Sequence, residues 1–301
     1  NERSAPDDAS ESAMIAGILL AIAGALSYGF LGVAFEASAK RGYRIWDFIF
    51  YKQVAGLVIG LALTIYLGQS LFDSRLIFLG FIGALSYVLT CAAYLMASRE
   101  RDISANWTIL NLSVLLPLFV SVIWFNDRFT ASKLLGFFLT IVSILLVGGG
   151  FSGAVRSREA RWLPYITIAF LLNGVLATLF RWVPDGYAAL FTVYFYGISL
   201  LLVVPLKIAS CRGWSREKGM LPLSTGAAFS HWLGMMLTMG ALHLVGRTSN
   251  QAGVIVYPIT NGFVIPVGVI LGVIFLRQKI GWRSRWGVAA GMAGLICLFL
   301  R

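Results

Sequence analysis

The sequence predicts an all-α polytopic membrane protein with ten transmembrane helices, arranged as two inverted five-helix repeats. Apolar stretches, each long enough to cross a bilayer, fill most of the 301 residues. The chain is 58% hydrophobic and only 12% charged, whereas roughly 25% of the residues in soluble domains are charged. Matching landmarks also occur in the same order in both halves. Lipid is therefore the expected solvent of most of the chain.

Helices, rather than the strands of a barrel, are expected for these stretches. A backbone inside lipid must satisfy its own hydrogen bonds, so only helices and closed barrels span membranes. The stretches are about twice as long as membrane strands and lack their alternation, and each fits the ~20 residues that a spanning helix needs. The expected spans begin near Met14, Ile45, Leu76, Ile103, Leu134, Leu163, Ala188, Leu221, Ser249 and Trp286.

The chain divides into a polar N-terminal tail at residues 1–12, a first five-helix repeat at 13–152 and a second at 153–301. The tail is too acidic and too polar for a secretory signal, so the first helix is expected to be a true span. Every connection between spans is short. Any function is therefore expected within the membrane or at its edges.

Basic residues are distributed unevenly among the connections. The odd connections hold sixteen Lys and Arg residues, the tails and even connections hold seven, and Lys52 lies inside the second span. The positive-inside rule therefore favours termini on the outer side. Although the net charge is +11, the basic residues in short loops set topology and form no surface for nucleic acid, which is not an expected partner.

The three cysteines predict neither a redox nor a metal site. Cys91 and Cys297 fall inside expected helices and Cys211 falls in a loop, without pairing or metal-ligand spacing. We therefore expect no cofactor and no metal.

Sliding the second half of the chain over the first aligns polar landmarks. Ser27-Tyr28-Gly29 falls on Leu172-Asn173-Gly174, and Ser86-Tyr87 falls on Ser230-His231. Because each half has an odd number of spans, the second half runs in the opposite sense across the membrane. Inverted repeats are typical of alternating-access transporters, whose central site lies where the halves meet.

A helix-loop pattern recurs at the ends of the fourth and ninth spans. Leu116-Pro117-Leu118 precedes Asn126-Asp127-Arg128, and Gly136 follows nine residues after Asp127. In the second half, Ile265-Pro266 precedes Arg277-Gln278-Lys279, and Gly287 follows nine after Gln278. With the span count and the repeat, this pattern resembles the ten-helix EamA-type members of the drug/metabolite transporter superfamily.

The family's usual glutamate in this pattern is Asp127 in one half and Gln278 in the other. The resemblance implies a transporter in the plasma (inner) membrane. It also implies cytoplasmic termini, so the sidedness stays open between this implication and the loop charges.

Polar side chains in mid-span are candidates for substrate contact, since they are costly in lipid and usually face the bundle interior. His231 and its repeat mate Tyr87 lie at the same expected depth, and helical spacing extends both into polar faces. The alternative is that such residues only join helices by buried hydrogen bonds. The candidate substrate-binding residues are Tyr28, Tyr87, Tyr94, Trp107, Asn111, Asn173, His231, Trp232, Tyr257 and Asn261.

Two further roles are expected for titratable residues. His231 is the candidate for proton coupling, because imidazole changes charge near neutral pH. Glu36 and Lys52 lie at the same expected membrane face and form either an ion pair or a gate. No carboxylate occurs in mid-span, which argues against exchange of a proton and a cationic drug on a buried acid.

Prolines and glycines interrupt the fourth and ninth spans, where they allow either a hinge or a static kink. They are Pro117, Pro258 and Pro266, with Gly253, Gly262 and Gly268.

The expected function is secondary transport of a small neutral or zwitterionic metabolite, such as an amino acid, by alternating access through a central cavity. Carriage of drugs or quaternary amines is the alternative within transport. The alternatives outside carrier transport are an intramembrane enzyme and a passive channel. For the enzyme, no catalytic constellation is visible around His231 and His243. The expected partners are a small-molecule substrate and the lipid bilayer, with the chain as a monomer or a homodimer.

Overall fold

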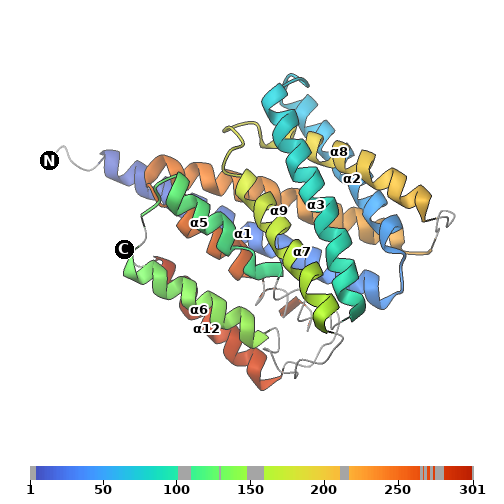
Figure 1. Ribbon diagram of the computed structural model, residues 1–301. Helices are drawn as coiled ribbons and strands as arrows, with labels where there is room; N and C mark the ends of the chain where they lie inside the picture. Colours follow the sequence, from blue (N-terminus) through green and yellow to red (C-terminus); the bar gives the residue numbers. More distant parts are fainter. Residues whose placement is uncertain are drawn as a thin grey trace.

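A computed structural model describes residues 5–100, 110–128, 130–147, 159–210, 217–264 and 281–299, together with 267, 270, 271 and 274. Every regular element in these ranges is helical. Helices run antiparallel or obliquely in one bundle (Figure 1). Their bounds are α1 Ala5–Lys40, α2 Ile45–Tyr66, α3 Ser74–Glu100, α5 Leu115–Trp124, α6 Ala131–Val147, α7 Glu159–Leu179, α8 Ala188–Ala209, α9 Met220–Thr248, α10 Ala252–Tyr257, the π-helix η1 Pro258–Gly262, and α12 Trp282–Phe299.

Five of these helices are long and apolar enough to cross a membrane, namely α1, α2, α3, α8 and α9. Shorter apolar helices occupy Leu110–Trp124, Ala131–Ser143 and Leu163–Leu179. Large apolar side chains such as Phe78 and Leu201 are more than 60% exposed, while the polar Gln53 and Thr192 are fully buried. This distribution is the reverse of that in soluble proteins. It confirms the expected all-α polytopic membrane protein.

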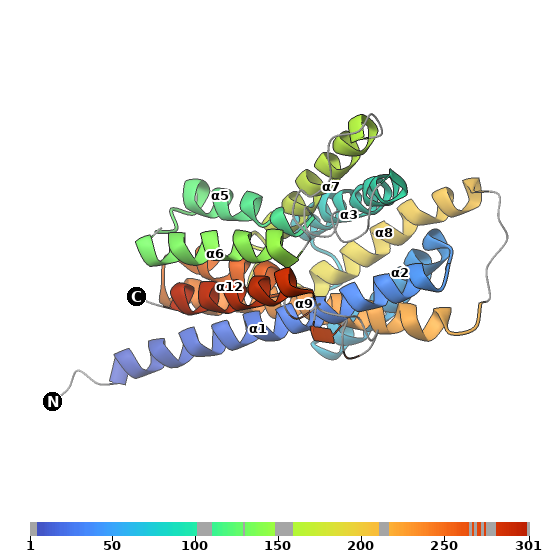
Figure 2. The ribbon, with the colours of Figure 1, turned by 90° about the horizontal axis from the view of Figure 1, so that it is seen from below.

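Helix contacts follow the two-fold pattern expected of two five-helix repeats. The first span, α1, packs on the eighth, α9, and the corresponding sixth span, α7, packs on the third, α3. The spans at equivalent positions of the two halves pack on each other as α2 on α8, α5 on α10 and α6 on α12. The last of these pairs lies at the lower edge of the bundle in Figure 1, and Figure 2 shows the same two helices side by side between α5 and α1.

Glycines allow the closest of these approaches. A Cβ atom on Gly80 of α3 would lie only 2.6 Å from Tyr194 Cβ of α8. Small residues at membrane helix contacts allow backbones to approach, so that dispersion and polar contacts can hold helices together without a hydrophobic driving force. The α3 and α8 contact therefore depends on the absence of a side chain at this point.

The first helix begins earlier than the sequence predicts. Helix α1 begins at Ala5, so residues 5–12 of the expected tail continue the first span. Once a helix is nucleated, each added residue forms one more hydrogen bond, and acidic residues in the first turns favour the helix dipole.

The fourth and ninth spans are both interrupted. Helix α5 starts at Leu115 after a turn at Ser113 and Val114. Helix α10 ends at Tyr257, where Pro258 opens the π-helix. Pro258 therefore confirms the interruption expected of the ninth span. Cys211, Pro266, Gly268 and the segment 277–279 lie outside the described residues.

Candidate functional site

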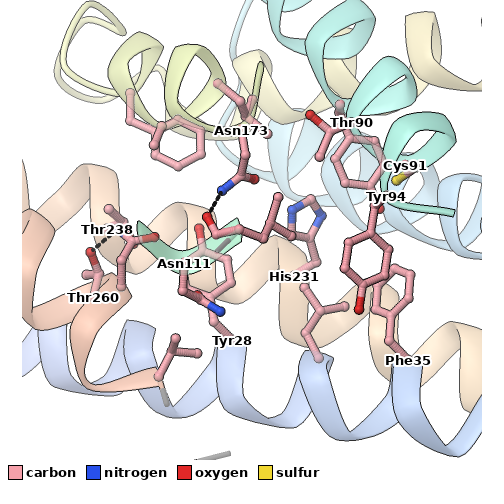
Figure 3. A pocket seen from close by; sticks show the side chains of 18 of the residues that line it. Tyr28, Phe35, Thr90, Cys91, Tyr94, Asn111, Asn173, His231, Thr238 and Thr260 are labelled. Atoms are coloured by element: carbon pink, nitrogen blue, oxygen red, sulfur yellow. Dashed lines mark hydrogen bonds between the residues drawn. The ribbon is translucent and has the colours of Figure 1, made fainter. Parts of the chain in front are cut away.

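A central cavity lies where the two halves of the chain meet (Figure 3). It contains about 1060 Å³ of space free of protein atoms, its open mouth included. Its walls come from α1, α2, α3 and the segment before α5 in the first half, and from α7, α9, α10 and η1 in the second. The lining residues are Tyr28, Leu31, Phe35, Ile49, Tyr87, Thr90, Cys91, Tyr94, Leu110, Asn111, Asn173, Leu176, Ala177, Phe180, His231, Thr238, Tyr257, Thr260, Asn261 and Val264.

The repeat mates Tyr87 and His231 meet on one wall of the cavity. Their rings are stacked, with centroids 5.3 Å apart and planes inclined at 28°. The Tyr28 ring approaches His231 from α1, at 6.2 Å between centroids. A Cβ atom on Gly234 would lie 2.8 Å from the Tyr28 ring. The glycine one turn after His231 therefore makes the room in which Tyr28 lies against α9.

Lys52 stands behind this wall and is fully buried. Its Nζ lies 3.0 Å from His231 Nδ1, and the Tyr196 hydroxyl lies 2.9 Å from the same nitrogen. The ammonium group also lies over two aromatic faces, 4.7 Å from the centroid of Tyr87 and 5.3 Å from that of Tyr196. Aromatic faces attract cations, so the rings stabilise the charge without neutralising it.

Several polar lining residues bond within the protein. Asn173 Nδ2 donates to Ser113 Oγ at 2.7 Å and lies 3.5 Å from the Leu110 carbonyl oxygen. The Thr238 and Thr260 hydroxyls donate to the carbonyl oxygens of Gly234 and Val256, about one turn earlier in the chain. These residues join or cap helix segments, as the alternative interpretation of the sequence expects.

Other polar atoms have no protein partner. Thr90 Oγ1 and the Tyr257 hydroxyl are buried and form no hydrogen bond with the described residues. Buried polar groups are normally paired, so these two atoms are available to a bound molecule. No group of three His, Cys, Asp or Glu among the described residues could hold a metal ion.

Eight of the ten residues predicted from the sequence to bind substrate line this cavity. Trp107 lies outside the described residues. Trp232 is placed elsewhere: its Nε1 donates to Thr192 Oγ1 of α8, and its ring contacts Phe229. Successive residues of a helix point about 100° apart, so His231 and Trp232 face different neighbours. The structure thus removes Trp232 from the set of lining residues.

Among the described residues, the hydrogen-bond partner of Lys52 is His231. Glu36 belongs to α1, but its side chain lies outside the described part of the structure. Sequence reasoning also missed the aromatic and aliphatic part of the wall, such as Phe35 and Phe180. Such residues give no signal in a sequence where almost every span position is apolar.

A polar network ties three connections together beyond the Tyr257 end of the cavity. Asp127 Oδ2 accepts hydrogen bonds from the backbone N–H groups of Gly253, at 2.6 Å, and Val254, at 3.3 Å. Its other oxygen pairs with Arg181 at 3.3 Å. The carboxylate thus caps the N-terminus of α10, where the helix dipole favours negative charge. Asp127 belongs to the pattern singled out in the sequence, and here it joins α5, α7 and α10.

Comparisons with known proteins give a family and a fold. Residues 15–149 match the model of the EamA-like transporter family. No curated protein matches the sequence. One of 28 similar solved chains, described as "Crystal structure of protein", has a TM-score of 0.75 at 12% identity and covers 94% of this chain and 96% of its own length. At that identity the likeness shows the fold alone.

Proposed function

We propose that this chain, whose residues 15–149 match the EamA-like transporter family, is a multi-pass membrane transporter of the drug/metabolite type. From its cavity we infer that it is a secondary carrier. The proposed substrate is a small neutral or zwitterionic metabolite, such as an amino acid. The proposed location is the plasma (inner) membrane.

One observation supports this proposal above the others: a single cavity is lined by equivalent helices of both halves, with the repeat mates Tyr87 and His231 in contact. A site at the contact of inverted repeats is exposed to either side when one half rocks against the other. In this proposal the network of Asp127, Arg181 and Gly253 is the gate at one end of the path, and alternating access requires that it open. All the described lining residues belong to one chain, which fits a monomer, and a homodimer would hold two such sites.

The lining favours small solutes over cationic drugs. No described residue that lines the cavity is a carboxylate, whereas a cationic drug needs a counter-charge in a site of low dielectric. Aromatic rings and a few hydrogen-bonding groups are typical of sites for small organic molecules.

Counterflow in proteoliposomes tests the carrier mechanism. The purified protein is first screened by thermal shift against a metabolite panel weighted to amino acids and quaternary amines, since a ligand of the folded state raises apparent stability. A solute that stabilises the protein is then labelled and used in the counterflow assay. Saturable counterflow is the expected result. Flux that never saturates would indicate a channel, and chemical conversion of the solute would indicate an enzyme.

His231 is the proposed proton-coupling residue. Gln at this position keeps a hydrogen-bond acceptor but does not titrate, so His231→Gln should remove the pH dependence of net uptake between about pH 5 and 8 while solute exchange continues. The measurement is uptake driven by a solute gradient at a series of pH values. A pH profile equal to that of the wild type would remove His231 from the coupling mechanism.

A further inference from the structure

Among the described residues, Lys52 has no carboxylate partner, unlike two other largely buried cations. Lys207 of α8 pairs with Asp47 of α2, and Arg181 pairs with Asp127. A further buried lysine, Lys133, bonds to the side-chain oxygen of Gln251. Lys52 is on the same helix as Asp47 and is fully buried, yet no described carboxylate lies within ion-pair distance of it. Its contacts are His231, Tyr87 and Tyr196.

An isolated ammonium ion inside the membrane is costly unless an anion accompanies it. An anion bound in the cavity could supply this charge, because Lys52 lies directly behind His231 and Tyr87, which line the cavity. Because the Lys52 ammonium group can only donate, His231 Nδ1 is the acceptor and the proton of the neutral ring is on Nε2. None of the described residues forms a hydrogen bond with that nitrogen, so its N–H is available to a ligand.

We propose that the cavity binds solutes through a carboxylate group, with His231 Nε2 as the hydrogen-bond donor and Lys52 as the counter-charge behind it. The proposal rests on the proposed carrier function and names the group that the site recognises. A charge-assisted donor binds an anion more strongly than a neutral one. The remainder of the solute lies against the aromatic wall formed by residues such as Tyr28 and Tyr94.

Matched acids and amides test the recognition of charge. Thermal shift of the purified protein is measured with acetate, benzoate and phenylalanine, and with acetamide, benzamide and phenylalaninamide, at equal ionic strength. Each pair has nearly the same shape but differs by the negative charge. At least one acid should stabilise the wild type more than its amide does, and the affinity for that acid follows from the concentration dependence of the shift.

Variants at Lys52 assign the effect to this side chain. Lys52→Met keeps the volume of the side chain and should weaken binding of the acid about tenfold or more, which is the effect of losing one ionic contact, while the response to the amide stays unchanged. Lys52→Arg should keep the preference for the acid. Lys133→Met is the matched control, because this lysine bonds to Gln251 away from the cavity.

Three outcomes would overturn the proposal. The first is an equal response of the wild type to every acid and its amide. The second is an unchanged preference in a folded Lys52→Met protein. The third is a preference that appears only in Glu36→Gln, which would identify Glu36 as the resident counter-ion. If the Met variant fails to fold, Lys52→Gln and the comparison of acid with amide in the wild type still test the recognition of carboxylate.

Transport assays distinguish a failure of this proposal from a failure of the proposed carrier function. Saturable counterflow of an acid that is unchanged in Lys52→Met would leave the carrier function standing and remove the recognition of carboxylate by Lys52. Binding of an acid that depends on Lys52, without counterflow of that acid, would leave the site standing and remove the carrier function.

Discussion

The ring of His231 connects most of the polar chemistry in the cavity. Its Nδ1 lies within hydrogen-bond distance of Lys52 Nζ and the Tyr196 hydroxyl. Its ring is stacked on Tyr87 and tilted towards Tyr28. A mid-span histidine in a sequence of this composition is a strong signal, because so few titratable groups compete with it. The sequence did not indicate that a lysine on another helix would be its partner. That contact joins residues 179 positions apart.

Gly234→Ala is expected to weaken solute binding several-fold, because the added Cβ would lie 2.8 Å from the Tyr28 ring and displace it from the cavity wall. The measurement is the solute affinity by thermal shift. The control is Gly226→Ala, where a Cβ meets nothing within 4 Å, and where alanine should stabilise α9 by about 0.5–1 kcal/mol. Equal affinities in the two variants would contradict the assigned position of Tyr28.

Trp232→Phe should leave counterflow unchanged, since this side chain faces α8 and not the cavity. Loss of the bond to Thr192 should lower the stability by about 1 kcal/mol, seen as a lower unfolding temperature. If transport is lost while the unfolding temperature is kept, Trp232 contacts the solute after all.

A short helix and its polar cap lie at the Tyr257 end of the cavity. Helix α10 has only six residues, all buried, before the chain passes into the π-helix. A helix of this length has little stability of its own. Its position therefore depends on Asp127, which reaches it from the connection between α5 and α6.

Asp127→Ala should lower the stability by about 3 kcal/mol, since it removes the cap of α10 and leaves the largely buried Arg181 without its carboxylate. The matched control is Asp185→Ala at the same face, which breaks an exposed ion pair with Arg247 worth less than ~1 kcal/mol. Unfolding temperatures in detergent provide the comparison. Similar small losses in both variants would mean that Asp127 does not hold α10.

Pairing of equivalent helices organises the molecule as a whole. The contacts of α1 with α9 and of α3 with α7 are related by the exchange of the two halves. Helices α6 and α12, which supply no lining residue in the described structure, pair at one edge. The beginning of α1 and the end of α12 lie toward the same side of the bundle (Figure 2). An even number of spans produces this arrangement.

Tags at the two ends of the chain should therefore react with an impermeant reagent from the same side of the membrane. A cysteine at Gly42, in the connection between α1 and α2, should react from the opposite side in a background that lacks Cys91, Cys211 and Cys297. The measurement is labelling of intact cells and of inverted vesicles. It also decides between termini outside, as the loop charges favour, and termini inside, as the family resemblance implies. Tags on opposite sides would mean an odd number of spans.

The sequence by itself determined the class of this protein, because lipid imposes its demand on every residue of a span and that demand appears as composition and length. It also determined the polar residues worth naming, such as His231 and Asn173, because polar groups are rare in such segments. Tertiary structure alone decided which of them share the cavity, that Trp232 faces α8, and that Lys52 bonds to His231. These are contacts between distant spans, and the spacing within one helix carries no information about its neighbour.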